Sequence, residues 1–187
     1  YPGQSGGQAV ANVLTGKSDP GGRLPLTFYR SVADLPPFDD YAMTGRTYRY
    51  FTGKPVYPFG YGLSFTSFAY APLTVTPAAG GAETGLRVTT EVSNTGKRSG
   101  DEVVQLYLNF PDQPGVPRVA LRGYQRVTLK PGERRAVTFD LSPRDLSAVA
   151  IDGTRQVMAG KYRVSVGSGQ PDSGVPVQSA QFTTART

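Results

Sequence analysis

The strongest constraint on the fold is an alternation of apolar and polar residues that fills the chain after residue 70. Residues 86–93 show it best, because Leu86, Val88 and Val92 are separated by polar neighbours. A period of two is typical of a strand with one buried face. Further strands are predicted at 103–110, 121–129, 137–141, 162–166 and near 177–183, with turns at 94–96 and 131–132. About seven short strands over roughly 115 residues predict a mainly β fold, an immunoglobulin-like (fibronectin type III-like) β-sandwich.

Two features place individual strands within this sandwich. Residues 104–108 read Val-Gln-Leu-Tyr-Leu and combine high β-propensity with no charge. Such a segment promotes aggregation at a sheet edge, so we expect it to be a central strand.

Residues 145–147, followed by Gly160-Lys161-Tyr162, resemble a tyrosine corner. Tyr162 is therefore expected to begin a late strand and to bond back to the preceding loop.

The first fifteen residues predict one short helix. Ser5 is a good N-cap, Gln8 follows it at capping-box spacing, and Gly16 is placed to end a helix over 5–15 in the left-handed conformation. Glycines are costly in a first turn, and Gly6 and Gly7 allow two interpretations. They let the helix approach another backbone closely, or they leave amides free for an anionic or sugar ligand.

Irregular structure is predicted from residue 17 to residue 50. Asp19-Pro20-Gly21-Gly22 is typical of a turn, and 24–29 of a short strand or extended segment in which Pro25 favours an edge position. Asp39 and Asp40 are neighbours that would point to opposite sides of an extended chain, so we expect a structural or solvated role and no catalytic pair. Residues 45–51 alternate arginine and aromatic side chains, which suits either a contact between domains or stacking on a sugar ring.

The stretch from Tyr57 to Tyr70 is rich in aromatic residues and glycine and carries no charge. Exposed aromatic side chains at this density would make the surface adhesive. We therefore expect them to be buried between two layers, with the stretch acting as a hinge between an irregular first part and the sandwich.

Composition excludes several kinds of chemistry. The chain has no cysteine and no histidine, so disulfides, thiolate metal sites and the commonest general base are absent. No apolar run approaches a membrane span. The net charge is +6, and its densest part, residues 118–135, holds Arg118, Arg122 and Arg126 among others. We interpret these as a solvated basic surface on outward strand faces; a nucleic-acid site is the alternative.

Two motifs are specific enough to identify a resemblance: Tyr-Pro-Phe-Gly-Tyr-Gly-Leu-Ser at 57–64 and Gly-Asp-Glu-Val-Val-Gln-Leu-Tyr at 100–107. They resemble motifs in the C-terminal part of the family-3 glycoside hydrolases, the β-glucosidase and β-xylosidase group. Others, in chain order, are Tyr1-Pro2-Gly3-Gln4 with Gly6-Gly7, 13–17, 20–25, 45–51, 94–96 and 131–133. The resemblance covers almost the whole chain. The Ser5 form of the first motif, together with 46–51, leans slightly towards the xylosidase-like members.

The resemblance implies a division of the chain. Residues 1–50 would be the end of an α/β sandwich domain, a truncated α/β segment. Residues 51–69 would be an aromatic and glycine-rich linker, and residues 70–187 the fibronectin type III-like domain. In this family an N-terminal (β/α)8-type barrel, absent here, carries the nucleophilic aspartate. The acid/base glutamate lies upstream of the segment that matches Tyr1-Pro2-Gly3.

By this resemblance the chain carries no catalytic residue, and no cofactor or metal site is expected. The glutamates of this chain that we compared with the family's catalytic positions match none of them; these are Glu83, Glu91, Glu102 and Glu133. The family chemistry is retaining hydrolysis through two carboxylates and a covalent glycosyl-enzyme intermediate. The chain would then be the structural, inactive C-terminal fragment of an exo-acting β-xylosidase or β-glucosidase in carbohydrate metabolism. The start at Tyr1 rather than Met agrees with a fragment.

The expected partners follow from the same resemblance. They are β-linked gluco- or xylo-oligosaccharides, bound by the missing catalytic domains, and those domains themselves, against which the chain would pack. No nucleic acid or membrane partner is expected, and the family points to a periplasmic or secreted protein. Without the rest of their sheet, residues 1–50 are expected to expose apolar groups such as Val10, Val13, Leu14 and Phe28.

Two other functions fit the sequence. A non-catalytic carbohydrate-binding module would use Tyr48, Tyr50, Tyr57 and Tyr61 as a stacking platform. An adhesive or spacer sandwich is the third hypothesis, although such domains usually occur in tandem and the chain shows no internal repeat.

Overall fold

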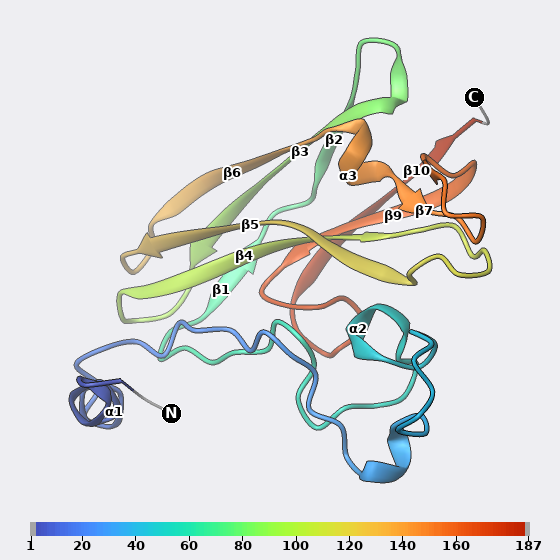
Figure 1. Ribbon diagram of the computed structural model, residues 1–187. Coiled ribbons are helices and arrows are strands. Elements are labelled where there is room, and N and C mark those ends of the chain that lie inside the picture. Colours follow the sequence, from blue (N-terminus) through green and yellow to red (C-terminus); the bar gives the residue numbers. More distant parts are fainter. Residues whose placement is uncertain (1–2, 186–187) are drawn as a thin grey trace.

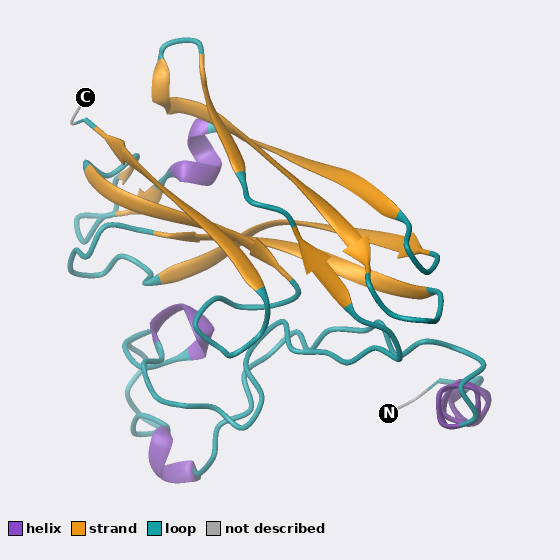
Figure 2. Ribbon diagram, turned by 180° about the vertical axis from the view of Figure 1, so that it is seen from behind, coloured by secondary structure: helices purple, strands orange, loops and turns teal. Residues whose placement is uncertain are grey.

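The computed structural model describes residues 3–185, and its main body is a sandwich of two β-sheets (Figures 1 and 2). The elements in chain order are α1 (Gly6–Leu14), a 3-10 turn (Val32–Asp34), α2 (Thr47–Tyr50), β1 (Phe68–Tyr70), β2 (Thr74–Ala78), β3 (Gly81–Asn94), β4 (Gly100–Asn109), β5 (Val119–Leu129), β6 (Arg134–Leu141), α3 (Pro143–Leu146), β7 (Ala148–Val149), β8 (Arg155–Gln156), β9 (Gly160–Gly167) and β10 (Val177–Thr184). None of these helices is both long and apolar enough to cross a membrane.

The long strand β3 organises the first sheet. It pairs with β6 along one edge and with β2 and then β1 along the other, always antiparallel. The second sheet has the antiparallel order β10-β9-β4-β5. β4 contains residues 104–108 and lies between two partners, which confirms the prediction of a central strand. The predicted mainly β, fibronectin type III-like architecture is confirmed.

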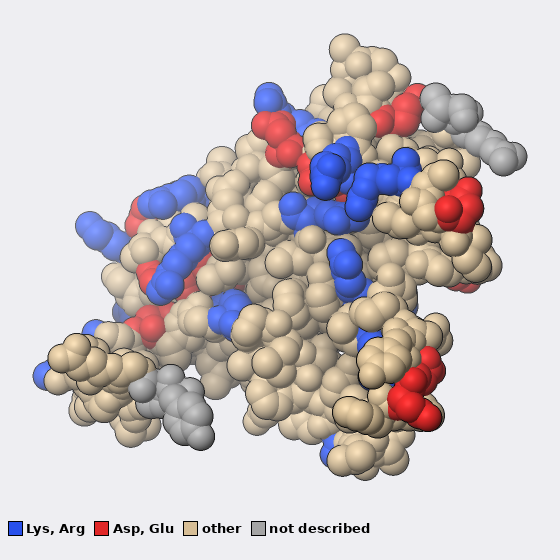
Figure 3. All heavy atoms as spheres, viewed as in Figure 1, with Lys and Arg blue, Asp and Glu red and all other residues tan. Residues whose placement is uncertain are grey.

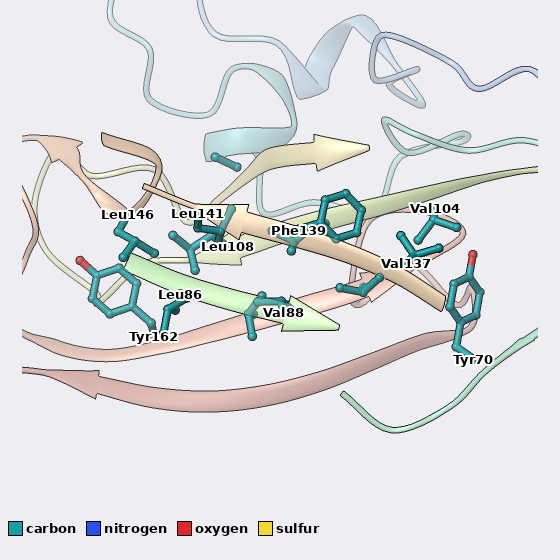
Figure 4. Close-up of a cluster of buried hydrophobic side chains, with 14 of the residues drawn as sticks. Tyr70, Leu86, Val88, Val104, Leu108, Val137, Phe139, Leu141, Leu146 and Tyr162 are labelled. Carbon is teal, nitrogen blue, oxygen red and sulfur yellow. The ribbon is translucent and has the colours of Figure 1, made fainter. Parts of the chain in front are cut away.

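The core lies between the inner faces of the two sheets, and Figure 4 shows side chains from both meeting there. The alternation seen in the sequence selects these residues on β3, where Val88 and Val92 are fully buried while their polar neighbours face outward. On β4 the whole stretch 104–108 is buried, because this strand is covered on both faces. The remaining core members include Leu86, Leu106, Leu108, Leu129, Val137, Phe139, Leu141, Leu146, Tyr162, Val164 and Val166. One continuous apolar layer of this kind supplies the main stabilisation of the fold.

Tyr162 forms the predicted tyrosine corner. Its hydroxyl accepts a hydrogen bond from the Met158 backbone N–H (2.9 Å) and donates one to the Met158 carbonyl oxygen (3.0 Å). The Thr184 hydroxyl donates to the same carbonyl (2.6 Å), and all these atoms are buried. The loop before β9 is thereby fixed to the end of β10.

We expect Tyr162→Phe to lower the free energy of unfolding by about 1–2 kcal/mol, because the buried Met158 N–H loses its acceptor. Urea denaturation followed by circular dichroism measures the change. Tyr124→Phe is the control, since Tyr124 is 68% exposed and should change little. Equal losses in the two variants would contradict the assigned role.

The part before residue 68 contains little regular structure and runs beneath the sandwich, with α1 standing apart at one end (Figure 1). α1 and the left-handed Gly16 (φ +72°) are as predicted, but Ser5 makes no side-chain capping bond, so the predicted capping box is wrong. Of the two forms expected for 24–29, the structure has no strand there and only one bridge, Phe28 with Tyr57, so the extended-segment alternative fits better. The alternation over 45–51 ends in the single-turn helix α2 instead of an extended segment.

The predicted turn at 19–22 is also wrong, and its glycine has a different purpose. Gly21 is buried, and a Cβ atom there would lie 2.9 Å from the Asp101 Cβ and 3.0 Å from its carbonyl oxygen. The backbone therefore approaches β4 too closely for any side chain. For Gly7, by contrast, nothing lies within 4 Å of a Cβ position, so close packing does not explain it.

The aromatic stretch is only partly buried, which corrects the expectation of burial between two layers. Tyr70 is buried, but Tyr57 and Phe65 are each 44% exposed. The physical reason is that the sandwich covers the stretch on one side only (Figure 2). Val10, Leu14 and Phe28 are exposed as predicted, whereas Val13 is half-buried.

Basic side chains are spread over the face shown in Figure 3 and do not form one block. Arg126, Arg134 and Arg135 face solvent as predicted. Arg118 and Arg122 do not: both are half-buried, and each has a buried Nε without a hydrogen-bond partner among the described residues. A β-bulge explains Arg122, because Leu121 pairs with Tyr107 and Gly123 with Leu106, which leaves Arg122 as the extra residue.

Candidate functional site: the junction beneath the sandwich

The first part of the chain is attached to the sandwich at a junction formed by residues 19–24, 57–65, Tyr70 and the start of β4. Its two segments pair with each other through backbone hydrogen bonds. The Leu24 N–H donates to the Tyr61 carbonyl oxygen, and the Gly60 N–H donates to the Leu24 carbonyl oxygen, both at 2.8 Å. A second pair joins Phe28 and Tyr57 (2.9 Å). The two segments thus reach the sandwich as one ribbon.

A buried ion pair lies at the centre of this junction. Arg23 Nη2 is 2.9 Å from Glu102 Oε2, and the two side chains are 10% and 1% exposed. The Tyr70 hydroxyl donates to Glu102 Oε1 at 2.6 Å. Arg23 also donates to the Ser168 carbonyl oxygen and to its own segment at the Gly21 carbonyl oxygen. One carboxylate on β4 therefore joins the N-terminal segment, β1 and the loop after β9.

Burial controls the ionisation of this group. Removal from water raises the pKa of Glu102, and the hydrogen bond from Tyr70 and the Arg23 guanidinium only partly offset this. Burial likewise raises the pKa of Tyr70, and the adjacent Glu102 charge adds to the effect. Tyr70 is therefore a neutral hydrogen-bond donor at ordinary pH.

Asp19 makes a second attachment. Its Oδ1 accepts from the Ser64 hydroxyl (2.8 Å) and the Phe65 N–H (2.7 Å), and its Oδ2 accepts from the Asp101 N–H (3.3 Å). A carboxylate that accepts three hydrogen bonds from two other segments fixes their relative position. The Asp19-Pro-Gly-Gly sequence thus has an anchoring role that turn statistics did not predict.

Gly60 sits in the third contact. The Gln105 side-chain amide donates to the Gly60 carbonyl oxygen (3.0 Å) and to the Ser168 carbonyl oxygen (3.0 Å). The Tyr107 hydroxyl donates to Gln105 Oε1 (2.6 Å), and both side chains are buried. In this part of β4, Leu106 points into the core of the sandwich. Its neighbours Gln105 and Tyr107 point to the opposite side, towards the junction.

The geometry of the junction favours attachment over catalysis. Glycoside hydrolysis by the two-carboxylate mechanism needs two carboxyl groups facing one sugar. Glu102 is sealed from solvent, and its oxygens are occupied by Arg23 and Tyr70. Glu91 and Glu133 lie on the surface beside Arg134 and Arg135. The absence of catalytic residues from this chain stays a prediction.

The tyrosines proposed as a sugar platform mostly pack against protein. Tyr48 stacks on Phe59 with ring centroids 4.0 Å apart, and its hydroxyl accepts from the Leu121 N–H (3.0 Å). Tyr57 and Tyr61 contact each other at 5.1 Å. The contact between α2 and β5 supports the interface interpretation of the 45–51 alternation.

Glu102 gives the junction a testable pH dependence. Its pKa is raised in the folded chain, so the folded state holds a proton that the unfolded state has released. The free energy of unfolding should therefore fall as pH rises from about 4.5 through the raised pKa. Because the chain has no histidine, few other groups titrate in the range just above the ordinary carboxyl pKa. Urea denaturation across this range should show the slope, and Glu102→Gln should remove it; an unchanged slope in the variant would refute the assignment.

Comparisons with known proteins agree with this arrangement. Residues 1–65 match the glycosyl hydrolase family 3 C-terminal domain, and residues 102–170 match the fibronectin type III-like domain. The chain is 40% identical over 173 residues to a xylan 1,4-beta-xylosidase of Xylanibacter ruminicola, covering 92% of this chain and 20% of that protein. It is 37% identical to a periplasmic beta-glucosidase of Salmonella typhimurium, covering 89% of this chain and 24% of that protein.

Solved structures show the same likeness in three dimensions. Beta-glucosidase 3B from Thermotoga neapolitana superposes with a TM-score of 0.82 and 33% identity, over 98% of this chain and 27% of that one. A beta-D-glucoside glucohydrolase from Trichoderma reesei superposes with a TM-score of 0.80 and 30% identity, over 98% of this chain and 29% of that one.

The sandwich and its junction define the class of a fibronectin type III-like domain joined to a preceding segment that matches the glycosyl hydrolase family 3 C-terminal domain. The chain belongs to the family-3 glycoside hydrolases and corresponds to their C-terminal part. It spans about a fifth to a quarter of the length of the curated relatives named above.

Proposed function

We propose that this chain is the non-catalytic C-terminal part of a retaining β-glycosidase that acts on β-linked glucosides or xylosides. Its role is structural: the sandwich supports the segment that precedes it. In this proposal residues 1–50 are the end of the α/β sandwich domain, 51–69 the linker and 70–187 the fibronectin type III-like domain. Relatives named as β-xylosidase and β-glucosidase support both specificities equally.

The observation that carries the proposal is the buried pair between Arg23 and Glu102. A buried charge pair costs solvation energy and is maintained only where good geometry compensates. Here the ion pair joins Arg23, in the segment that matches the glycosyl hydrolase family 3 C-terminal domain, to Glu102, in the strand where the match to the fibronectin type III-like domain begins. A second support is the apolar surface before residue 68, where Leu14, Val32 and Phe38 are 82%, 84% and 97% exposed. Such a surface suits packing against another domain.

The test compares the chain alone with a longer protein that includes the family's upstream domains. The longer protein should hydrolyse aryl β-glucosides or β-xylosides with retention of anomeric configuration, and the isolated chain should not. Hydrolysis by the isolated chain, or a folded longer protein without activity, would overturn the proposal. The ratio of the rates on the two aryl glycosides decides between glucosidase and xylosidase.

A further inference from the structure

A cleft of about 610 Å³ lies where the N-terminal segment meets the loop after β9, outside the contacts of the buried ion pair. Figure 1 shows α2 and this loop side by side beneath the sandwich. The cleft is lined by Thr27, Arg30, Tyr48, residues 51–56, Pro58, Tyr61, Arg118 and residues 170–173. Its volume is in the range of small-molecule sites.

Two residues that line this cleft carry buried polar atoms without hydrogen-bond partners. Among the described residues only three buried side-chain nitrogen or oxygen atoms lack a hydrogen bond, and two of them, Thr27 Oγ1 and Arg118 Nε, belong to residues that line it. The Arg118 guanidinium makes one long hydrogen bond, to the Phe51 carbonyl oxygen at 3.5 Å. Buried polar groups are normally satisfied, so such a pair marks a place where a ligand can supply the missing partner.

The charge of the cleft is positive. Arg30, Lys54 and Arg118 come from three different segments and line it together. Arg30 is fixed by a hydrogen bond from its Nε to the Lys54 carbonyl oxygen (3.0 Å), and the Lys54 side chain is exposed. The one carboxylate in the lining, Asp172, is already held by two nitrogens of Arg163. Asp172 also interacts with the charge of Arg118, so the lining carries three cations and one carboxylate, a net positive charge that favours an anionic ligand.

The walls of the cleft are aromatic. Tyr48, Phe51 and Tyr61 are among its lining residues, together with Thr27, and each of the three rings also packs against a neighbouring aromatic residue. Aromatic walls pack against the apolar face of a sugar ring, while a planar carboxylate matches the fork of a guanidinium group. Neither an inorganic anion nor a neutral sugar would use both features.

We propose that this cleft binds a uronic acid unit, with its carboxylate at Arg118 and Lys54 and its ring against the aromatic walls. The site would recognise an acidic sugar substituent, separately from any catalytic centre. The inference goes beyond the proposed function, and its test measures binding alone, so its failure would leave that proposal untouched.

The experiment is a titration of the ¹⁵N-labelled chain with glucuronate, glucose and acetate, followed by amide chemical shifts. Glucuronate should produce saturable shifts around residues 51–56 and 118, with an affinity at least about tenfold above those of glucose and acetate. Equal binding of glucose would overturn the role of the carboxylate. Equal binding of acetate would overturn the role of the ring, and the absence of saturable shifts with glucuronate would overturn the site itself.

Variants locate the site. Arg118→Gln and Lys54→Gln should each weaken glucuronate binding about tenfold, because each removes one charge-assisted contact. Arg134→Gln is the matched control: this arginine is exposed on β6, pairs with Glu91, and should leave the affinity unchanged. If Arg118→Gln disturbs folding, Lys54→Gln still tests the site, because the Lys54 side chain is exposed and its replacement should not affect folding. Unaltered affinity in Lys54→Gln would overturn the assignment.

Discussion

Arg23→Met is expected to lower the free energy of unfolding by about 3 kcal/mol, because it leaves the Glu102 carboxylate buried without its cation. Methionine keeps the apolar stem of the side chain, so the decrease in the free energy of unfolding measures the contribution of the guanidinium group. Urea denaturation measures it. Hydrogen exchange should also show faster exchange of the Leu24 and Gly60 amides, which pair across the ribbon.

Two further variants isolate this effect. The double variant Arg23→Met/Glu102→Gln should recover more than half of the loss, since the uncompensated charge is gone. Arg126→Met removes the cation of a surface pair with Asp101 in which the arginine is 59% exposed, and should cost at most about 0.5 kcal/mol. Equal losses for Arg23→Met and Arg126→Met would show that the buried pair does not hold the junction together.

Gly60→Ala is the second variant with a large expected effect, a loss of about 3 kcal/mol. Gly60 has φ +78°, a left-handed backbone conformation that costs a residue with a side chain about 1 kcal/mol. A Cβ atom would also lie 2.3 Å from Gln105 Oε1 and 2.4 Å from the Tyr107 hydroxyl. Both groups are buried and bonded to each other, so moving them adds about 2 kcal/mol.

Gly132→Ala is the matched control, because Gly132 has φ +76° and nothing within 4 Å of a Cβ position. It should cost only the conformational part, about 1 kcal/mol. Urea denaturation of both variants gives the difference. If the two losses are equal, the close approach of Gly60 to β4 contributes nothing to the junction.

The sandwich could be predicted from the sequence because its signals are local. Alternation in 86–93 determines which face is buried, and the uncharged stretch 104–108 identifies a central strand. The tyrosine corner follows from Tyr162 and its position at the start of β9. These features depend on neighbours along the chain, so a single sequence contains them.

The junction could not be predicted in the same way. Glu102 lies in a recognisable motif, but its partner Arg23 is 79 residues away, and no periodicity links them. Asp19-Pro-Gly-Gly has turn composition, yet it is extended because Asp19 finds hydrogen-bond donors on β4 and near Phe65. The positions of Arg118 and Arg122 likewise depend on three-dimensional contacts and on a bulge in β5. The sequence-based prediction overstated the burial of the aromatic stretch, and its role as a hinge stays a prediction.

We infer that the junction holds the C-terminal part together and takes no part in the chemistry proposed above. The most direct test is the kcat of the longer protein carrying Glu102→Gln, measured on an aryl β-glycoside at a temperature where the protein is folded. We predict a value within about twofold of the unsubstituted protein, together with a lower midpoint of thermal unfolding. A fall of about 100-fold or more, the usual effect of losing a general acid or base, in a variant with unchanged circular dichroism would contradict the account.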